Sequence, residues 1–481
     1  MVFDSVFPLH QDWEVLPLGE VCQRGGGNVQ TGPFGSQLHA SDYVAEGIPS
    51  VMPQNIGDNK ILEGNIARIT EADAQRLSKY RLRKGDIIYS RRGDVERRAL
   101  VRESEEGWLC GTGCLRIRFG EGIVYPKYAA HYLGHPAVRE WIVRHAHGAT
   151  MPNLNTTILS ELPFVLPPWA VQVSIGDAIE LYDQKIDLNR HINQTLEAMA
   201  QAIFKSWFVD FDPVKAKIAA IEQGEDPLRA AMRAISGKTD AKLDQMPREH
   251  YDQLATTAAL FPDEMEKSDL WEIPKGWVVS ALGSVTSYLS RGISPKYLEN
   301  GGVLVLNQKC IRDFRVDESK GRRHDPTQRK IDGRALELGD VLVNSTGVGT
   351  LGRVAQVLCL SEPTIVDSHV TVVRASHQLN ASYLGQYIIW KHPDIEAMGE
   401  GSTGQTELSR AKLAELPILT PRENVLKAFN NMISPLNNEI SANDRESVKL
   451  AELRDTLLPK LLSGELSVSD VSKLANTTGA A

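Results

Sequence analysis

At 481 residues, the chain is longer than one ordinary hydrophobic core supports, so two or more domains are expected. The N-terminal stretch MVFDSVFPLHQDW lacks the basic start and apolar run of a signal peptide, and no segment approaches 18 uninterrupted apolar residues, so we expect a cytoplasmic protein without membrane contact. The net charge of −8 argues against general binding to nucleic acid, although a whole-chain sum can hide a local basic patch.

The first predicted element is a globular module from about residue 13 to 167. It is rich in short β-type runs such as IPSVM, DIIYS and LRIRF, separated by Gly, Asn and Asp turns. A helical pattern over 128–143 closes it. We expect an α+β module of mostly antiparallel strands.

A long helix is predicted over 169–211. Apolar or seam residues recur in it at alternating steps of four and three, the heptad pattern of a coiled coil. A polar residue in such a seam costs stability but fixes the register. The seam includes Ile179, Tyr182, Ile186, Asn189, Leu196 and Ile203.

Residues 212–270 follow as a partly helical connector, in which helix formers such as PVKAKIAAIEQ alternate with polar stretches such as SGKTDAK. The segment has no counterpart later in the chain. Its role cannot be assigned from the sequence.

The chain then repeats itself. RKGDIIYSRRG (83–93) returns as ELGDVLVNSTG (337–347), an offset of 254 (340 − 86 = 254), and Glu161-Leu162-Pro163 returns at the same offset as Glu415-Leu416-Pro417. Tyr128 and Tyr132 return at 255 as Tyr383 and Tyr387. Small shifts around a constant offset indicate a duplicated fold, with the second module at 271–420.

The second module is followed by a second long helix over 421–466, in which Thr420 is the expected N-cap, Glu423 completes a capping box, and Pro435 and Pro459 are expected to kink the helix. Its seam includes Ile433, Leu436, Ile440, Asn443, Leu450 and Leu457. Either each helix packs on its own module, or the two pair with each other; the matched seams favour pairing. With pseudo-two-fold symmetry the helices would form an antiparallel coiled coil, and about 38 residues would make a spacer of ~57 Å between two heads. Residues 467–481 are expected to be a flexible tail.

No catalytic site is predicted. Gly347-Val-Gly349-Thr-Leu-Gly352 matches a dinucleotide-binding pattern, but the residues after it resemble a strand and not the required helix, which favours a glycine-rich hairpin. Leu166-Pro-Pro-Trp resembles an amino-methyltransferase motif, but Leu166 cannot hold the target amine. Cys110 and Cys114 lack a second ligand pair, so buried thiols are expected and no metal or cofactor.

Basic and amide side chains near glycine-rich loops are candidates for DNA contacts. Arginine and lysine bind phosphates, and arginine, asparagine and glutamine can also bind base edges. The module scaffold recurs while these loop residues differ, which is typical of two readers of different half-sites. A single residue of this kind can equally be a solvated surface group. The candidates are Gln37, Gln54, Asn55, Arg81, Arg83, Arg91, Arg92, Arg97 and Arg98 in the first copy, and Arg291, Asn307, Gln308, Lys309, Arg322, Arg323 and Arg353 in the second.

The chain resembles the specificity (S) subunits of type I restriction-modification systems. The resemblance is carried by TGPFGSQLHASDYVAEGIPSVMPQNI (31–56), KGDIIYSRRGD (84–94), FKSWFVDFDPVKAK (204–217), GVLVLNQKCIRD (302–313) and LRDTLLPKLLSGEL (453–466). It implies that 1–168 and 271–420 are target-recognition domains and that 169–211 and 421–466 are conserved helices that pair as an antiparallel coiled coil.

The resemblance further implies a non-catalytic subunit that recognises a bipartite, asymmetric double-stranded DNA sequence. Its expected partners are two adenine methyltransferase (M) subunits, which would flip the target adenine out of the stack, and ATP-dependent restriction (R) subunits. No small-molecule substrate is expected. The alternatives are a type IIB-like or orphan methylation system, a pseudo-symmetric scaffold with no DNA role, and a methyltransferase or nuclease in its own right.

Overall fold

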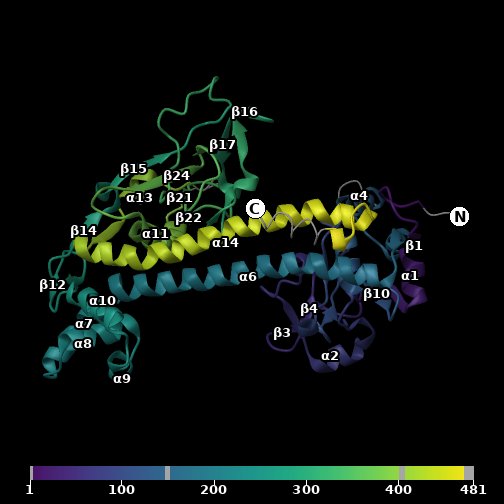
Figure 1. The fold of residues 1–481 in the computed structure, drawn as a ribbon, viewed down its shortest axis with the longest axis horizontal. Helices are drawn as coiled ribbons and strands as arrows, with labels where there is room; N and C mark the ends of the chain where they lie inside the picture. Colours follow the sequence, from purple (N-terminus) through teal and green to yellow (C-terminus); the bar gives the residue numbers. More distant parts are fainter. Residues whose placement is uncertain (1–3, 147–151, 400–406, 471–481) are drawn as a thin grey trace. The chain divides into compact units, whose positions relative to one another are not determined.

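A computed structural model describes residues 4–146, 152–399 and 407–470 (Figure 1). The chain divides into two compact units, each containing one β-rich domain. The first unit comprises Met1–Leu188 and Glu446–Ala481, and the second Asn189–Arg445. Because the long helices α6 (Trp169–Phe208) and α14 (Glu423–Ser463) cross both boundaries, each unit holds part of both helices.

The domain of the first unit contains two sheets. The larger has the order β2-β10-β7-β8-β5, and the smaller β3-β6-β4-β9. Most pairs are antiparallel, but β4 with β9 and β5 with β8 are parallel. The strands of the two sheets are β2 (Gly26–Thr31), β10 (Cys114–Gly120), β7 (Ile87–Ser90), β8 (Arg98–Leu100) and β5 (Asp58–Asn59), then β3 (Tyr43–Val44), β6 (Ala67–Ile69), β4 (Ile48–Val51) and β9 (Leu109–Cys110).

The first and last strands of this domain, β1 (Glu14–Pro17) and β11 (Pro163–Leu166), form a separate antiparallel pair next to α6. The single helix predicted over 128–143 is in fact two helices, because Pro136 cannot donate the backbone hydrogen bond that a helix interior requires. The helices of this domain are α1 (Leu18–Arg24), α2 (Glu71–Arg76), α3 (Pro126–Tyr132), α4 (Pro136–His145) and α5 (Thr156–Glu161).

The domain of the second unit repeats this plan. One sheet has the order β15-β24-β21-β22, the other β16-β20-β17-β23, and β14 pairs with β25. The elements are β14 (Val278–Ala281), β15 (Thr286–Arg291), β16 (Tyr297–Leu298), β17 (Val303–Leu306), β18 (Ile311–Arg312), β19 (Arg315–Val316), β20 (Arg322–His324), β21 (Val341–Asn344), β22 (Val354–Gln356), β23 (Thr364–Val366), β24 (Val370–Ala375), β25 (Pro417–Thr420), α11 (Ala381–Trp390), α12 (His392–Ala397) and α13 (Arg410–Ala414).

Equivalent hydrogen bonds occur in the two copies. The Tyr128 hydroxyl donates to the carbonyl of Val165 (2.9 Å), and the Tyr383 hydroxyl donates to the carbonyl of Leu419 (2.5 Å). Tyr132 and Tyr387 donate in the same way to the carbonyls of Pro163 and Pro417. Each of the repeated segments 83–93 and 337–347 contains a buried aspartate that pairs with an arginine: Asp86 with Arg118, and Asp340 with Arg374. The repeated residues are therefore the ones that hold each domain together.

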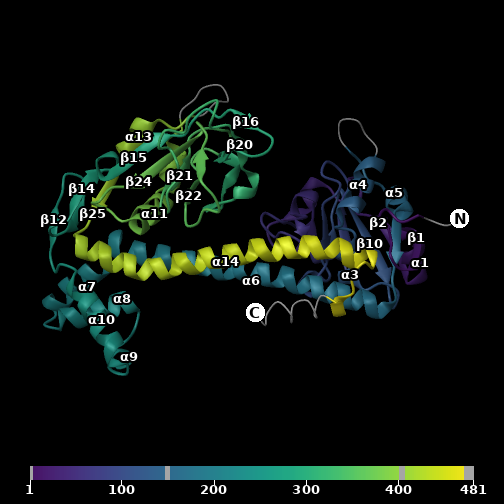
Figure 2. The same ribbon diagram turned by 45° about the horizontal axis from the view of Figure 1, so that its top comes forward.

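The helices α6 and α14 lie side by side and antiparallel (Figures 1 and 2). In the second unit, the side chain of Asn189 on α6 donates to the carbonyl of Asn443 on α14 (3.3 Å). Asn193, four residues further along α6, contacts the carbonyl of Ile440, which lies three residues before Asn443 on α14, as expected for an antiparallel pair. The predicted mixed α+β fold with paired long helices is thus confirmed. Of the twelve predicted seam residues, Ile179, Ile186, Asn189, Ile433, Ile440 and Asn443 are buried, and Tyr182, Leu196, Ile203, Leu436, Leu450 and Leu457 are half-buried.

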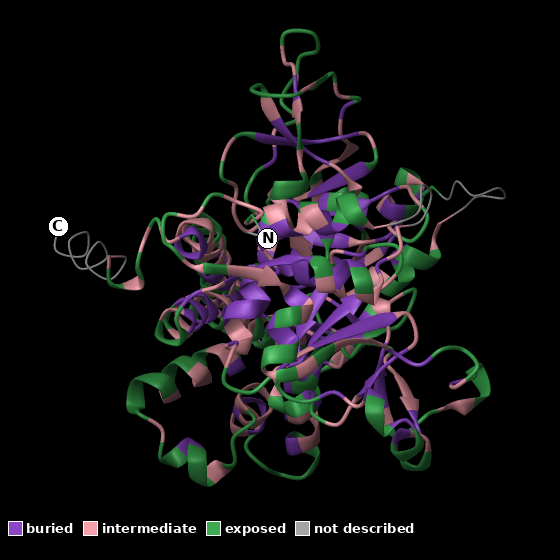
Figure 3. Ribbon diagram, turned by 90° about the vertical axis from the view of Figure 1, so that its right-hand side faces the viewer, coloured by how far each residue is buried: buried purple, intermediate pink, exposed green. Residues whose placement is uncertain are grey.

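Each domain shares its core with both helices. In the first unit, Ile175 and Ile179 of α6 and Leu461 of α14 belong to the domain core. In the second unit, aromatic residues of α6 pack edge-to-face in the domain core; the ring centroid of Phe208 lies 4.8 Å from that of Tyr383 and 5.0 Å from that of Phe429. The buried positions coincide with the sheet strands and the inner helix faces (Figure 3).

One prediction about α14 is corrected. Thr420 is the last residue of β25, and its hydroxyl has no partner, so it does not cap the helix, which begins at Glu423. The helix continues through Pro435 and Pro459, and the kink expected at these prolines stays a prediction. Pro435 is exposed, so water can satisfy the carbonyl that loses its partner, and the break costs less than it would in a core.

The connector contains four helices, α7 (Asp212–Glu222), α8 (Pro227–Ser236), α9 (Asp240–Asp244) and α10 (Arg248–Ala259), with a small core around Met232. A hairpin of β12 (Met265–Lys267) and β13 (Glu272–Pro274) leads into the second domain. Lys217 donates to the Phe261 carbonyl (2.6 Å), and Phe261 packs on Trp207 of α6. The connector thus packs on the second unit, to which it belongs.

The five cysteines are free thiols, and burial raises the pKa of Cys22 and Cys110 to about 12. No helix in the described parts of the chain has the length and apolar character needed to cross a membrane. Residues 471–481 of the predicted tail lie outside the described residues.

The buried amides of the helix pair predict a measurable cost of mutation. Asn443 donates to the Asn193 side-chain oxygen (2.9 Å), and Asn193 donates to Asp444 (2.9 Å). Asn193→Leu leaves a buried amide without its acceptor, so we expect the stability to fall by about 1–3 kcal/mol, seen as a lower urea midpoint. Adding Asn443→Leu removes the stranded amide and recovers part of that loss. A single variant within about 0.5 kcal/mol of the wild type contradicts this role.

Candidate nucleic-acid interface

In the first domain, four loop segments meet beyond the end of β7. The backbone N–H of Arg91 donates to the carbonyl of Gly113, and the carbonyl of Arg91 accepts from Leu154 (both 2.8 Å). Arg92 forms an antiparallel bridge with Asn153. The Arg91 guanidinium lies over the ring of Phe34, which is 54% exposed, at 5.8 Å from the ring centroid. The arrangement combines a cation, an exposed aromatic face and glycine-rich backbone, the groups that contact phosphates and bases.

The second domain builds the same backbone arrangement from different side chains. At the 254-residue offset, Ser345 stands for Arg91 and Thr346 for Arg92. The carbonyl of Ser345 accepts from Leu408 (2.8 Å), and Thr346 bridges Glu407, just as Arg91 and Arg92 contact Leu154 and Asn153. The turn glycines Gly93 and Gly347 both have positive φ, 74° and 102°, which other residues rarely adopt. The backbone is thus the same in both copies while its side chains differ: Arg92 is exposed, Arg91 and Thr346 are half-buried, and Ser345 is buried.

The hydroxyls of the second copy lie in a polar network. Gln308 donates to the Thr346 hydroxyl, and that hydroxyl lies 2.8 Å from Nδ1 of His369. Thr346 and His369 were not singled out from the sequence, although the 254-residue offset from Arg92 already points to Thr346. Amide, hydroxyl and imidazole groups are suited to hydrogen bonds with base edges.

The second domain also has a basic surface cavity of about 660 Å³. Arg291 pairs with Glu407 (2.5 Å) and donates to the carbonyl of Leu408 (2.9 Å). Arg334 and Arg410 contribute two further guanidinium groups to its wall. The second domain therefore has a positive surface near its Ser345-Thr346 turn, although its arginines are not at the positions equivalent to Arg91 and Arg92. Neither Arg334 nor Arg410 was predicted, because neither lies in a basic cluster of the sequence.

Several predicted residues have roles inside their domain. Asn55 is buried, and its side chain donates to the carbonyl of Leu62 (3.1 Å). Arg98 is 6% exposed; its Nε donates to the carbonyl of Ala130 (2.9 Å), and its guanidinium packs where Gly134 has no Cβ. Gln37 accepts from the Tyr80 hydroxyl (2.7 Å). Burial argues against direct DNA contact by Asn55 and Arg98.

Other predicted residues are bound by neighbours at the surface. Arg81 pairs with Glu71 (2.6 Å), Arg97 with Asp94 (2.5 Å) and Arg323 with Glu362 (2.6 Å). Such exposed pairs contribute little stability and can exchange for a phosphate. Arg353 donates to the Gly349 carbonyl (2.8 Å) and Asn307 to the Lys320 carbonyl (3.3 Å).

The remaining candidates are accessible. Arg322 is exposed and lies over the ring of Tyr297, 3.4 Å from its centroid. Exposed side chains are also found at Gln54, Arg83, Arg92 and Lys309.

Comparison with known proteins gives a consistent result. The family profile "Type I restriction modification DNA specificity domain" matches residues 10–198. The HindI specificity subunit of Haemophilus influenzae, a type I restriction enzyme subunit, is 29% identical over 95% of this chain and 100% of that protein. The MjaIX specificity subunit of Methanocaldococcus jannaschii is 22% identical over 96% of this chain and 95% of its own length.

The chain belongs to the type I restriction-modification specificity subunits. Its fold is also that of the S subunit from M. genitalium, with a TM-score of 0.51, 14% identity and coverage of 95% of this chain and 99% of that one. The subunit provides DNA target specificity and is a non-catalytic component of its system.

The structure of this specificity subunit also explains the two false motifs. The glycines at 347–352 lie between β21 and β22, which form an antiparallel hairpin. The helix that a dinucleotide site requires does not follow them. Leu166 ends β11, and Trp169 begins α6.

Two neighbouring arginines distinguish a structural role from a surface role. Arg98→Ala leaves the buried carbonyl of Ala130 without a donor, and we expect a loss of about 2–3 kcal/mol in stability. Arg97→Ala, the matched control, removes only an exposed pair and should stay within about 0.5 kcal/mol of the wild type. Urea unfolding of both variants measures the difference; equal midpoints contradict the assignment.

Proposed function

We propose that this specificity subunit recognises a bipartite, asymmetric double-stranded DNA target, with one half-site for each recognition domain. The observation that carries the proposal is the shared backbone at Arg91-Arg92 and Ser345-Thr346, where one copy presents guanidinium groups and the other the half-buried Thr346 hydroxyl beside a buried Ser345. Two domains with the same backbone at this turn but different side chains are suited to binding two half-sites of different sequence. The paired helices set the separation between the half-sites.

The proposed partners are two adenine methyltransferase (M) subunits and the ATP-dependent restriction (R) subunits. The subunit supplies no chemistry, so base flipping, methyl transfer and cleavage belong to these partners. The complex acts on DNA in the cytoplasm. An acidic chain with a net charge of −8 gains much of its phosphate contact from partner subunits, so the complex binds DNA better than the isolated chain.

The readout that tests this function is the methylation pattern. The subunit is co-expressed with its M subunit, and modified adenines are mapped genome-wide by long-read sequencing. We expect one split motif, two short specific blocks around a fixed gap. A continuous motif contradicts two half-sites. A stable complex without any modification favours a scaffold, and the split motif in cells that lack an R subunit favours an orphan methylation system.

Loop exchange assigns the half-sites. Replacing Arg91 and Arg92 by Ser and Thr, the residues of the second copy, should change one block of the motif and leave the other block and the gap unchanged. Because the backbone at these positions already accepts both pairs, folding should be preserved. A change in both blocks, or in the gap, contradicts the one-domain-one-block assignment.

The salt dependence of binding tests the phosphate contacts. With the M subunits present, the double variant Arg91→Ala/Arg92→Ala should bind DNA more weakly. The slope of log affinity against log salt should become smaller in magnitude by about 1–2, because binding releases about one counterion fewer from the DNA for each phosphate contact that is lost. Arg144→Ala, an exposed arginine of α4 in the same domain, is the matched control and should leave the slope unchanged. Equal slopes for all three proteins contradict the contact.

A further inference from the structure

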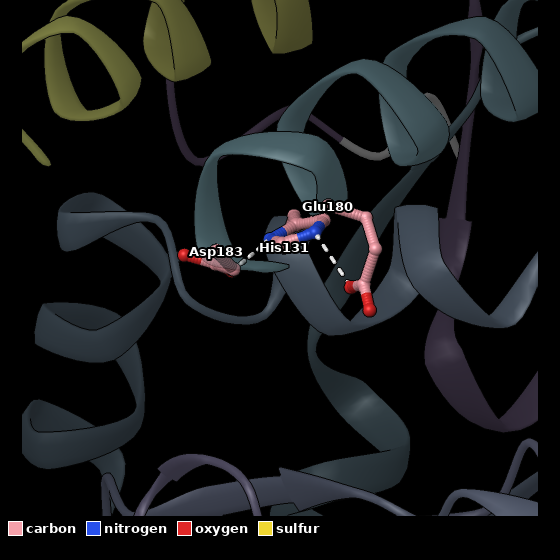
Figure 4. A group of neighbouring side chains, drawn as sticks. All are labelled: His131, Glu180 and Asp183. Atoms are coloured by element: carbon pink, nitrogen blue, oxygen red, sulfur yellow. Dashed lines mark ion pairs between the residues drawn. The ribbon is translucent and has the colours of Figure 1, made fainter. Parts of the chain in front are cut away.

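A buried group of titratable side chains in the first unit has no part in DNA recognition as described above. His131 lies on α3, and Glu180 and Asp183 lie one turn apart on the same face of α6 (Figure 4). Nε2 of His131 is 3.8 Å from a Glu180 oxygen, and Nδ1 is 4.0 Å from an Asp183 oxygen. Each residue offers one ligand atom within 4.8 Å of the others.

Two of these atoms are buried without a partner. His131 is 3% exposed and Glu180 1%, and neither Nε2 of His131 nor Oε2 of Glu180 makes a hydrogen bond. A buried polar atom without a partner is costly and calls for an explanation. Here the two unpartnered atoms face each other.

Neither tautomer of a neutral His131 resolves the conflict. Burial, with the nearby positive charges of Arg98, Arg454 and Arg102, lowers the pKa of His131, which favours the neutral ring. One ring nitrogen then carries a lone pair that faces a carboxylate oxygen, whichever nitrogen holds the hydrogen. Distances of 3.8 and 4.0 Å are also too long for an N–H···O bond. A cation bound to Nε2 of His131 and Oε2 of Glu180 would give both of these unpartnered atoms a partner.

The outer oxygens of the carboxylates are already held. Arg102 donates to Oε1 of Glu180 (2.5 Å), and Arg454 of α14 donates to Oδ1 of Asp183 (2.6 Å). Each carboxylate therefore keeps its other oxygen for the histidine side. Orientation of ligating carboxylates by such outer hydrogen bonds is usual in metal sites.

The donor set selects the kind of ion. One imidazole nitrogen and two carboxylate oxygens suit zinc and similar transition metals, whereas calcium needs six to eight oxygens. The two arginines balance the two carboxylates, so binding must come from ligand bonds and not from net negative charge. Tetrahedral zinc places its nitrogen and oxygen ligands roughly 3.4 Å apart. Nε2 and Oε2 are 3.8 Å apart, and the three ligand atoms lie within 4.8 Å of one another, so ion binding requires the three side chains to close together.

We propose that His131, Glu180 and Asp183 form a binding site for one transition-metal dication of the zinc type, which fastens α3 of the first recognition domain to α6. The sequence predicted no metal site, since the three residues are spread over 131–183 and do not form a ligand motif. The fold brings them together. The proposal does not depend on the proposed function.

The second copy provides an internal comparison. At the repeat offsets of 255 and 254, Gln386 stands for His131, Ser434 for Glu180 and Asn437 for Asp183. The carbonyl of Gln386 accepts from Gln201 of α6 (3.2 Å). The second domain is thus seated on α6 through amides, without an ionisable ligand set, and we expect one ion per chain.

The test uses the full-length subunit, freed of metal and of any histidine tag, titrated calorimetrically with Zn²⁺. We expect one ion per chain, a raised melting temperature, and an absorption band with Co²⁺ as the spectroscopic probe. His131→Gln and Asp183→Asn carry the residues that the second copy has at these places, so they are designed to fold. Each should lower Zn²⁺ affinity at least tenfold with unchanged circular dichroism.

His145→Gln, which removes an exposed histidine of α4 in the same domain, is the matched control and should bind as the wild type does. If the wild type binds no ion, or if His131→Gln and Asp183→Asn bind like the wild type, the proposal is overturned, and a water or a proton bridges the ring and the carboxylates. If either variant fails to fold, the other and the Co²⁺ spectrum of the wild type decide between the same two outcomes.

Discussion

The pairing of α6 with α14 is the constraint on which the rest of this specificity subunit depends. Neither helix is independent of the domains, because the apolar residues of each belong to a domain core, Ile179 in the first unit and Phe429 in the second. The buried amides of Asn189, Asn193 and Asn443 require partners at definite heights along the pair. A slip of one turn would strand these amides in the core, so the register is fixed. The second domain therefore packs on the two helix segments of its unit at one defined position along them.

Charged contacts at the edges of the two cores add to this attachment. In the second unit, Arg315 of β19 contacts Glu197 of α6 (2.5 Å) and Asp444 of α14 (2.6 Å), so one side chain joins the domain to both helices. In the first unit, Lys60 pairs with Asp187 of α6 (2.8 Å). Domain and helices thus form one body within each unit. A domain attached in this way keeps its orientation on the helix segments of its own unit.

The duplication was the most predictive feature of the sequence, and the structure explains its success. Asp86 and Asp340 are buried and paired with arginines, and the tyrosines at 128 and 383 bond to equivalent carbonyls, so any loss would destabilise a domain. Such residues must recur when a fold is duplicated. The coiled-coil pairing was predictable for a similar reason, since the seam residues need an apolar partner along their whole length.

Predictions of single residue roles were less successful, because residue type does not report burial. Arg98 belongs to a basic cluster in the sequence, but the alternation of β8 turns it toward α3, while its neighbour Arg97 faces solvent. Thr420 has the right spacing for a cap, but strand pairing with Val278 holds it in β25. His131 is far in sequence from Glu180, and only the packing of α3 on α6 brings them together.

The turn that follows β7 in the first copy and β21 in the second has the same backbone in both copies but different side chains. Its glycines and backbone bonds recur in both copies, while the two residues between them are arginines in one copy and hydroxyl residues in the other. Arg92 and Thr346 lie at the surface, so exchanging them should change the stability of a domain by no more than about 0.5 kcal/mol, whereas Ser345 is buried and tolerates less change. Under the proposed function, a lineage can therefore change its recognition sequence by substitutions at Arg92 and Thr346, and each intermediate remains a folded protein on which selection can act.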